Sequence, residues 1–254
     1  MRREEGRGRR AGAPSQVVVD DLGGAHVSIE GGEAEHLRKV LRLRPGDRVS
    51  ATDGRGTRGV LEITSFGRGR VETAVRERRR EPAPERRYWI ATRAAGPRFD
   101  WLVEKAVEMG AAGLIALVPD GGPRPRLERW ERLARAALGQ CLGAWATTLA
   151  SAGGAREAVE RGVPEGGEWT SVQVADATAG RAMDPRVGLP GDHLLLVGPP
   201  EGFGPADRDF LAGRPETGRI RLGERRLRSE TAALALLALA TLGRPETVNS
   251  PGRG

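Results

Sequence analysis

A short stretch near the carboxyl end of the chain combines charged side chains with a strongly apolar segment. Arg225, Arg226 and Arg228 stand close together, Glu230 follows, and residues 231–242 are almost all apolar. A charged loop held between a strand and a buried helix is a typical place for functional residues. A cationic turn in front of a core helix explains the same residues equally well.

The elements on either side of this loop would hold it firmly. Residues 219–222 alternate charged and apolar side chains, which is typical of a short strand. Ser229 is a good N-cap, and Glu230 suits the positive end of a helix dipole. Gly243 and Pro245 would end the helix. Because a helix that is apolar on all sides has to be buried, we expect a core helix here.

The segment just upstream has the same order of elements. Residues 194–197 are a short apolar run that predicts a buried strand, residues 198–204 form a turn-rich loop, and Pro205 suits the first position of a helix. Two successive strand–loop–helix units predict a parallel α/β sheet with a site at the carboxyl ends of its strands. The glycines match neither G-x-G-x-x-G nor a P-loop, so the common nucleotide fingerprints are absent.

Charge favours a polyanionic partner. The chain has 254 residues, a net charge of +7 and an isoelectric point near 10.8, which favours binding to nucleic acid. Most of the excess lies in the first third of the sequence. Lys39 and Lys105 are the only lysines, so a general preference for arginine in the genome is an alternative explanation.

Several classes of protein are disfavoured by the sequence. Cys141 is the only cysteine, which excludes a disulfide within the chain and favours a cytoplasmic protein. No apolar segment follows the charged amino terminus, so we expect no signal peptide, and no run is long enough to cross a membrane. His26, His36 and His193 lack the spacing of metal ligands, so we expect no metal.

The amino-terminal part predicts a small β-barrel. Residues 15–78 contain short alternating segments separated by glycine turns, with strands expected at 16–20, 25–30, 48–51, 60–64 and 70–76. Residues 32–43 have helical spacing, which places four apolar side chains on one face: Ala34, Leu37, Val40 and Leu41. Basic side chains surround this face: Arg38, Lys39, Arg42 and Arg44.

The rest of the chain predicts a second, α/β domain. Residues 78–87 are charged and contain proline, so we expect a linker there. Strands are expected at 88–92, 114–118 and 171–176, a helix at 99–109, and a long helix over 127–149 with a break at Gly139 or Gly143. Residues 1–13 are rich in arginine and glycine and are expected to be disordered.

Four blocks of residues stand in order along residues 15–245. The first combines Glu35-His36-Leu37, Val40-Leu41-Arg42 and Gly46-Asp47; the second is Lys105-Ala106 with Glu108 and Gly110. The third is Val197-Gly198-Pro199 with Gly202-Phe203; the fourth, and most specific, is Leu222-Gly223, Leu227-Arg228 and Glu230-Thr231-Ala232. In this order and spacing they resemble the motifs of the RsmE-type small-subunit rRNA uridine-N3 methyltransferases of the SPOUT class.

The resemblance implies an α/β fold class, with an N-terminal PUA-like β-barrel followed by a SPOUT α/β trefoil-knot methyltransferase domain. The RNA-binding barrel would span 14–80 and the methyltransferase domain 81–246, with tails at 1–13 and 247–254. A homodimer and S-adenosyl-L-methionine as methyl donor are also implied. The cofactor would lie in the knot loops, near the loop after Val174, against Val197, Gly198, Pro199, Glu201, Gly202, Leu222, Gly223, Arg226, Leu227 and Thr231.

The implied reaction is methylation of N3 of a uridine in 16S rRNA of the small ribosomal subunit. Because N3 must lose its proton, negative charge develops on the ring oxygens, and a fixed cation would stabilise it. Arg228 is the candidate cation. Glu230 would take the proton or orient Arg228, or it would only favour the helix N-terminus. Arg38, Lys39 and Arg42 would hold RNA phosphates.

Two departures from the family pattern keep other interpretations open. Pro200 stands where the family usually has a glutamate, with Glu201 one position later, and Ala95 stands where a lysine is common. The alternatives are a SPOUT methyltransferase with another RNA target, or a catalytically decayed relative that acts in RNA binding or ribosome assembly. Binding of the cofactor separates the enzymes from the RNA-binding protein.

Overall fold

The computed structural model describes residues 16–93, 96–119 and 121–242. The predicted tails, the predicted helix end at Gly243 and Pro245, and Ala95 lie outside these residues. The chain divides into two compact units, each with its own sheet. Of the described residues, the first unit comprises 16–83 and 138–145, and the second comprises the rest of the range 84–242.

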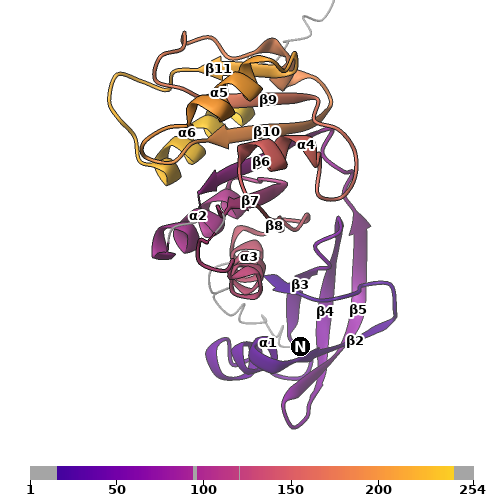
Figure 1. Ribbon diagram of the computed structural model, residues 1–254. Helices are drawn as coiled ribbons and strands as arrows, with labels where there is room; N and C mark the ends of the chain where they lie inside the picture. The colour runs from indigo at the N-terminus through magenta and orange to yellow at the C-terminus, as the bar shows by residue number, and fades with distance from the viewer. Residues whose placement is uncertain (1–15, 94–95, 120, 243–254) are drawn as a thin grey trace, which may run out of the picture. The chain divides into compact units, whose positions relative to one another are not determined.

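A curled five-stranded sheet forms the first unit (Figure 1). Its strands are β1 (Gln16–Val18), β2 (His26–Glu30), β3 (Arg48–Thr52), β4 (Thr57–Phe66) and β5 (Arg70–Arg80), in the order β1-β3-β4-β5-β2. β1 pairs with β3 in parallel, and the other pairs are antiparallel. Two irregularities in the β4–β5 register bend this long hairpin. Leu22, Leu61 and Ile63 are among the side chains that fill the core.

The helix predicted over 32–43 is shorter and wider than expected. α1 (Gly31–Glu35) continues into a π-helical turn, η1 (His36–Val40), in which the Leu41 amide donates to the His36 carbonyl at 3.0 Å. Leu37 is fully buried, as expected, but Val40 is 65% exposed. The prediction that Val40 shares the buried face was therefore wrong, because the wider turn rotates it away from Leu37.

A segment from the middle of the sequence completes the first unit. The predicted helix over 127–149 ends earlier, as α3 (Leu127–Cys141), and Leu142 takes a left-handed conformation with φ of 57°. The Gln16 side-chain amide donates to the Gly143 carbonyl at 2.7 Å, and the Gly56 amide donates to the Ala144 carbonyl at 2.8 Å. The Trp145 ring lies so close to Gly56 that no side chain would fit there.

A parallel six-stranded sheet forms the second unit, as predicted. Its strands are β6 (Arg86–Arg93), β7 (Gly113–Leu117), β8 (Thr148–Ala152), β9 (Ser171–Ala175), β10 (Gly191–Val197) and β11 (Thr217–Ile220), in the order β11-β9-β10-β6-β7-β8. β8 begins at Thr148, inside the helix predicted over 127–149, so the end of that prediction was wrong. β5 continues to Arg80 and β6 begins at Arg86, so the linker is shorter than expected.

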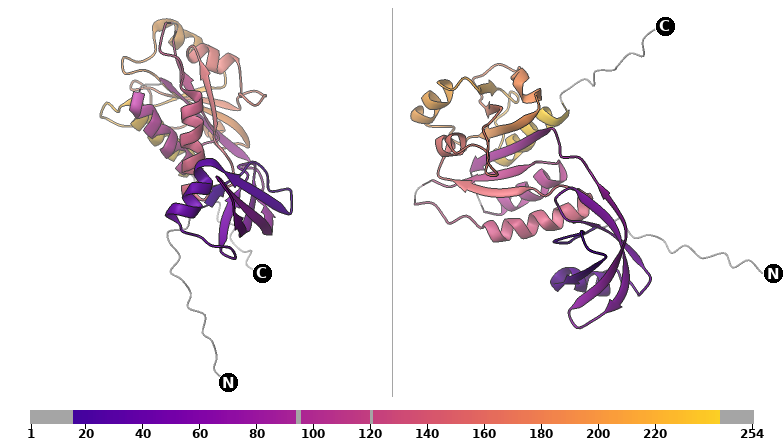
Figure 2. Two further views of the ribbon diagram at one scale, coloured as in Figure 1. Left: turned by 90° about the horizontal axis from the view of Figure 1, so that it is seen from below. Right: turned by 90° about the vertical axis from the view of Figure 1, so that its right-hand side faces the viewer.

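Helices cover both faces of this sheet (Figure 2). α4 (Ala155–Glu160) and α5 (Pro205–Ala212) pack on one face, around Trp89, Val174 and Leu196. α2 (Gly96–Glu108) packs against α6 (Ser229–Leu242), which lies on β6 and β10. A short 3₁₀ helix, η2 (Pro185–Gly188), precedes β10.

The apolar helix α6 is buried on one side only. Ala233, Leu236 and Leu237 are fully buried, whereas Leu239 is 43% exposed and Leu242 is 79% exposed. The expectation of burial on all sides was therefore wrong for the single chain, since β6, β10 and α2 cover only one face of the helix. Leu239 and Leu242 lie on the other, exposed face of the helix.

Candidate active site

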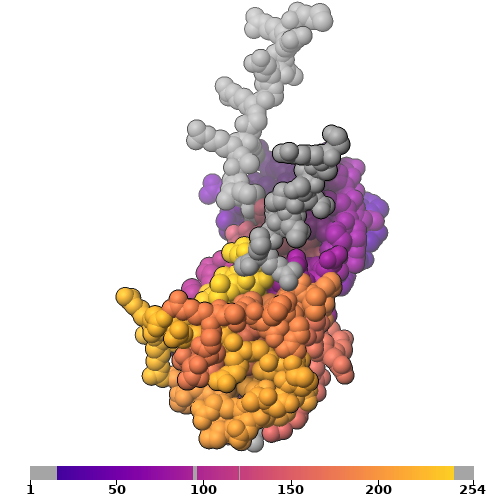
Figure 3. Space-filling model, turned by 90° about the horizontal axis from the view of Figure 1, so that it is seen from above, coloured from indigo at the N-terminus to yellow at the C-terminus, as the bar shows by residue number. Residues whose placement is uncertain are grey.

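The larger of two adjoining cavities lies at the carboxyl ends of β9, β10 and β11. Its volume is about 640 Å³. Three loops surround it, at residues 175–178, 197–203 and 221–227, together with Arg208, Ser229 and Ala232. In Figure 3 the segments that carry these loops, coloured orange and yellow, lie against each other on one face. Ligands of open parallel sheets bind at this edge, so the position agrees with the prediction.

The loop after β10 is shaped by a tight turn. The Gly202 amide donates to the Pro199 carbonyl at 2.8 Å, and Gly202 has φ of 83°, a conformation that favours glycine. The Phe203 ring packs on Gly198, where an added Cβ would lie 3.2 Å from the ring. Glu201 is 67% exposed at its side chain and accepts a hydrogen bond from Arg93 at 3.2 Å. This exposed ion pair connects the loop with the end of β6 but contributes little to its stability.

Two hydrogen bonds connect the loop before α6 with the loop after β10. The Ser229 hydroxyl donates to the Gly198 carbonyl at 3.3 Å, and the Arg226 guanidinium donates to the Pro200 carbonyl. α6 begins at Ser229, so this side chain joins two loops and does not act as the predicted N-cap. Arg228 precedes the helix, and its carbonyl accepts from the Ala232 amide.

An ionised carboxylate lies at the end of β9 on the cavity wall. Burial by itself would raise the pKa of Asp176, but hydrogen bonds from Thr178 and Arg219 outweigh it and hold the pKa below its usual value. The Arg219 Nε donates to the carboxylate at 2.8 Å. Asp176 therefore carries a negative charge at neutral pH, which its ion pair with Arg219 offsets.

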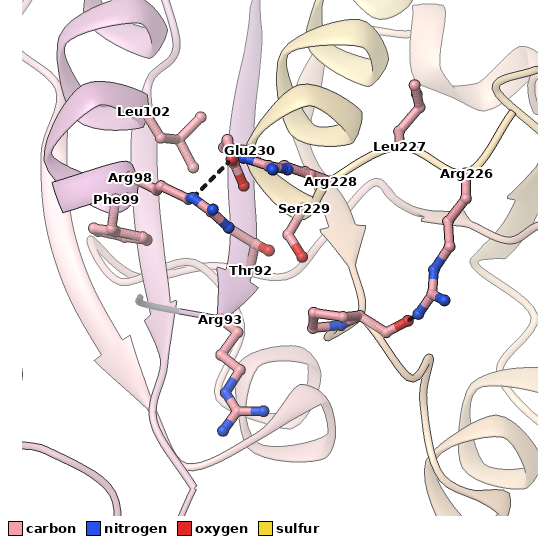
Figure 4. Close-up of a pocket in the computed structure, with 11 residues that line it drawn as sticks. Thr92, Arg93, Arg98, Phe99, Leu102, Arg226, Leu227, Arg228, Ser229 and Glu230 are labelled. Carbon is pink, nitrogen blue, oxygen red and sulfur yellow. Dashed lines mark hydrogen bonds and ion pairs between the residues drawn. The ribbon is translucent and has the colours of Figure 1, made fainter. Parts of the chain in front are cut away.

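The smaller cavity adjoins the larger one and has a volume of about 210 Å³. Pro200, Arg226, Leu227 and Ser229 line both cavities. The remaining lining residues come from the end of β6, from α2 and from the start of α6: Thr92, Arg93, Arg98, Phe99, Leu102, Arg228 and Glu230. Figure 4 shows Arg98 pointing toward Glu230. The two side chains form an ion pair with 3.7 Å between Nε and Oε1.

The structure gathers most of the predicted site residues around these two cavities. Arg228 and Glu230 line the smaller cavity. The predicted cofactor residues line the larger cavity, apart from Thr231: Val197, Gly198, Pro199, Glu201, Gly202, Leu222, Gly223, Arg226 and Leu227. Thr231 is exposed on the first turn of α6 and lines neither cavity.

The three predicted RNA-binding residues lie in the first unit. Arg38 and Lys39 stand on η1, and Arg42 follows it with φ of 53°. The Lys39 ammonium forms an ion pair with Glu35 at 2.8 Å, and both side chains are largely exposed. The pKa of Glu35 is lowered by its hydrogen bond from Lys39.

Sequence reasoning missed the contribution of β6 and α2. Thr92 and Arg93 end β6, while Arg98, Phe99 and Leu102 stand on the first two turns of α2. Parallel strands bring their carboxyl ends to one edge of a sheet, so the end of the strand predicted at 88–92 was a signal for Thr92. No local pattern indicates that β6 lies beside β10.

The described residues contain neither a membrane-spanning helix nor a metal-binding cluster. None of the helices within 16–242 that the structure describes is long and apolar enough to cross a membrane. In the same described part of the chain, no group of three or more histidine, cysteine, aspartate or glutamate side chains is placed to hold a metal ion.

The fold and cavities define a class: a two-domain α/β protein with a cavity at the carboxyl ends of a parallel sheet, preceded by a small β-domain. Family models agree with this division. An RNA methyltransferase domain matches residues 83–241, and an RNA methyltransferase PUA domain matches residues 29–75. The chain belongs to this family of RNA methyltransferases, so the predicted PUA-like and methyltransferase domains are confirmed.

Individual relatives carry a more specific name. Ribosomal RNA small subunit methyltransferase E of Mycobacterium tuberculosis is 29% identical over 228 residues, which cover 84% of this chain and 85% of the relative. The protein of the same name from Synechocystis is 26% identical, with 89% and 74% covered. These names agree with the resemblance that the four sequence blocks carry.

Solved structures share the fold. A probable rRNA-methyltransferase from Porphyromonas gingivalis is 28% identical, with a TM-score of 0.71 and coverage of 88% of this chain and 95% of that chain. Ribosomal RNA small subunit methyltransferase E from Neisseria gonorrhoeae, solved with S-adenosyl methionine, has a TM-score of 0.75 at 23% identity, with 90% and 97% covered.

Proposed function

We propose that this protein transfers a methyl group from S-adenosyl-L-methionine to N3 of a uridine in the 16S rRNA of the small ribosomal subunit. Three observations support the proposal. The chain belongs to an RNA methyltransferase family, relatives matched over most of their length are named small-subunit rRNA methyltransferases, and a large cavity stands at the carboxyl edge of the parallel sheet. The cavity is the observation that carries the catalytic part of the proposal.

The larger cavity fits the cofactor. Its volume of about 640 Å³ lies within the range of small-molecule sites. A Cβ added at Gly202 or Gly223 would meet no protein atom within 4 Å, so a ligand can approach the backbone closely at both positions. When bound, S-adenosyl-L-methionine would supply an electrophilic methyl group on a sulfonium cation.

Arg228 and Glu230 would act in the smaller cavity. The Arg228 guanidinium would stabilise the negative charge that develops on the ring oxygens as N3 loses its proton. Glu230 would take that proton or orient Arg228. Its side chain is only 16% exposed, which suits a group that works inside a closed site. Positioning accounts for most of the remaining rate enhancement, because methyl transfer is an in-line displacement that needs little covalent help.

The amino-terminal domain would hold the RNA. Arg38, Lys39 and Arg42 would contact phosphates, which position an RNA without reading its sequence. The domain boundaries proposed from the sequence are 14–80 for the RNA-binding domain and 81–246 for the methyltransferase domain. The family models, at 29–75 and 83–241, are compatible with these boundaries.

Two further features of the proposal concern assembly and topology. The exposed leucines of α6, Leu239 and Leu242, would be buried in a homodimer. A trefoil knot is also proposed. After β11 at one edge of the sheet, the chain returns past β9 to place α6 on β10 and β6. A return of this kind is required for the carboxyl-terminal segment to thread a loop.

Calorimetry with S-adenosyl-L-methionine tests the proposal. We expect saturable binding with one site per chain, followed by transfer of a methyl group to small subunits that lack the modification and detection of 3-methyluridine. Arg228→Ala is expected to bind the cofactor and to lose most of the transfer activity. A folded protein that binds no cofactor would refute the catalytic proposal and leave the RNA-binding relative as the better description. Binding without transfer to the small subunit would favour another RNA target.

A further inference from the structure

The wall of the smaller cavity contains a buried hydroxyl that has no hydrogen-bond partner within the described part of the chain. Thr92 is 1% exposed, and its Oγ1 is buried without a hydrogen-bond partner among the described residues. The residue stands near the end of β6 and lines the cavity beside Arg98, Ser229 and Glu230 (Figure 4). An unsatisfied buried hydroxyl costs stability, so its position in a cavity wall indicates that a ligand completes its hydrogen bonding.

The shape and lining of this cavity suit one nucleobase. Its volume of about 210 Å³ is below the range of sites for drug-sized ligands and much smaller than the adjoining cofactor cavity. Phe99 and Leu102 are almost fully buried and give it an apolar floor. Leu227 and Pro200 form an apolar wall that is shared with the larger cavity. A flat ring with a polar edge fits this combination.

An enzyme that modifies N3 has to reach the Watson–Crick edge of the base. Such enzymes take the target base out of its stack and read its edge by hydrogen bonds in a pocket. We propose that the smaller cavity receives the flipped-out uracil, and that Thr92 reads its polar edge while Arg98 positions Glu230 beside it. This inference rests on the proposed function and adds two residues that the sequence motifs did not indicate.

Thr92 suits the edge of uracil because a hydroxyl both donates and accepts. Its O–H can donate to a ring oxygen next to N3, and this bond strengthens when negative charge develops on that oxygen. Arg98 acts through another residue. Its Nε lies 3.7 Å from Glu230 Oε1, and it connects the first turn of α2 with the first turn of α6.

Thr92→Val tests the hydrogen bond. The substitution keeps the shape of the side chain and removes the hydroxyl. Because none of the described residues bonds to the hydroxyl, thermal stability should be unchanged or increased. We expect kcat/KM for methylation of small subunits to fall about 3- to 10-fold, with the Kd for S-adenosyl-L-methionine unchanged. Thr217→Val is the matched control, since Thr217 Oγ1 is also buried without a partner in the described structure but lines neither of the two adjoining cavities.

Arg98→Ala tests the positioning of Glu230. We expect kcat to fall between about 10- and 100-fold with little change in KM or cofactor binding, because a small displacement of a reacting group is costly. Arg98→Lys should restore part of kcat. Arg161→Ala is the control, since Arg161 has the same side-chain exposure of 58% and pairs with Glu157 away from both cavities.

The outcomes separate this inference from the proposed function. If the wild-type protein methylates uridine but Thr92→Val matches it, or if Thr217→Val loses as much activity, the base pocket is refuted and the enzyme remains. If Arg98→Ala keeps the wild-type kcat, the positioning role of Arg98 is refuted. If the wild-type protein binds the cofactor and transfers no methyl group to RNA, the proposed function fails, and the base pocket fails with it.

Discussion

The loop after β10 allows a clean test of how backbone conformation supports the cofactor site. Gly202 has φ of 83°, and an added Cβ would meet no atom within 4 Å. Gly202→Ala therefore introduces no clash within the protein, and its backbone cost is that of a left-handed conformation in a residue with a side chain, about 1–2 kcal/mol. If the loop relaxes in the free protein, the Kd for S-adenosyl-L-methionine should rise at least about 5-fold, because contact between the added methyl group and the cofactor adds to the backbone cost.

Calorimetry and thermal unfolding together measure this cost. If the variant keeps the native loop in the free protein, the same free energy appears as a lower midpoint of thermal unfolding. Gly180→Ala is the control, because Gly180 lies outside the left-handed region and an added Cβ there also meets nothing within 4 Å. A Gly202→Ala protein with the wild-type Kd and the wild-type unfolding midpoint would refute the argument from backbone strain.

Three further predictions follow from packing, charge and the RNA-binding domain. Gly113→Ala would place a methyl group 2.1 Å from a buried indole ring, so we expect a loss of about 1–3 kcal/mol or more, seen as a lower midpoint of thermal unfolding. The hydrogen bond from Arg186 is the main cause that holds the pKa of Asp184 below 3.8. The ionised carboxylate therefore stabilises the folded protein above that pH, and this stabilisation is lost as the pH falls through the native pKa of Asp184. Asp184→Asn should therefore lower the midpoint of thermal unfolding at pH 7 by the equivalent of roughly 1 kcal/mol. The difference in midpoint between the variant and the wild type should shrink below pH 3.8. A difference in midpoint that persists in acid would contradict this prediction. Replacing Arg38 and Arg42 together by glutamate should weaken RNA binding about tenfold or more and lower its salt dependence by about two counterions; unchanged affinity in a filter-binding titration would exclude them as phosphate contacts.

The polar–apolar alternation and the turn residues of the sequence correctly predicted several helices and strands in both domains. The strands at 16–18, 26–30 and 48–52 and the helix opened by Pro205 lie where the alternation and the turn residues place them. The pattern failed over 142–149, where the apolar spacing of a helix continues past the end of α3. There the backbone turns at Leu142, and residues 148–152 pair with β7 as β8. Pairing with a distant strand overrides a local preference.

The apolar segment at 231–242 shows a second limit of prediction from sequence composition. Its composition correctly predicted a helix, but composition does not determine how many of its faces a single chain covers. β6, β10 and α2 pack on one face, and Leu239 and Leu242 remain exposed on the other. Ser229 shows the same limit. The sequence indicated an N-cap, but it did not indicate that the Ser229 hydroxyl lies within hydrogen-bond distance of the Gly198 carbonyl.

The sequence by itself determined the family, the two domains and the two loops that carry the third and fourth motif blocks, because these depend on residue types at fixed spacing. Only the tertiary structure brought Thr92 and Arg98 to Glu230. Strand order is set by the packing of the whole sheet, and β6 lies beside β10 although most of the domain separates them in sequence. The carboxyl ends of these two strands therefore meet at one edge, where residues distant in sequence line a common cavity.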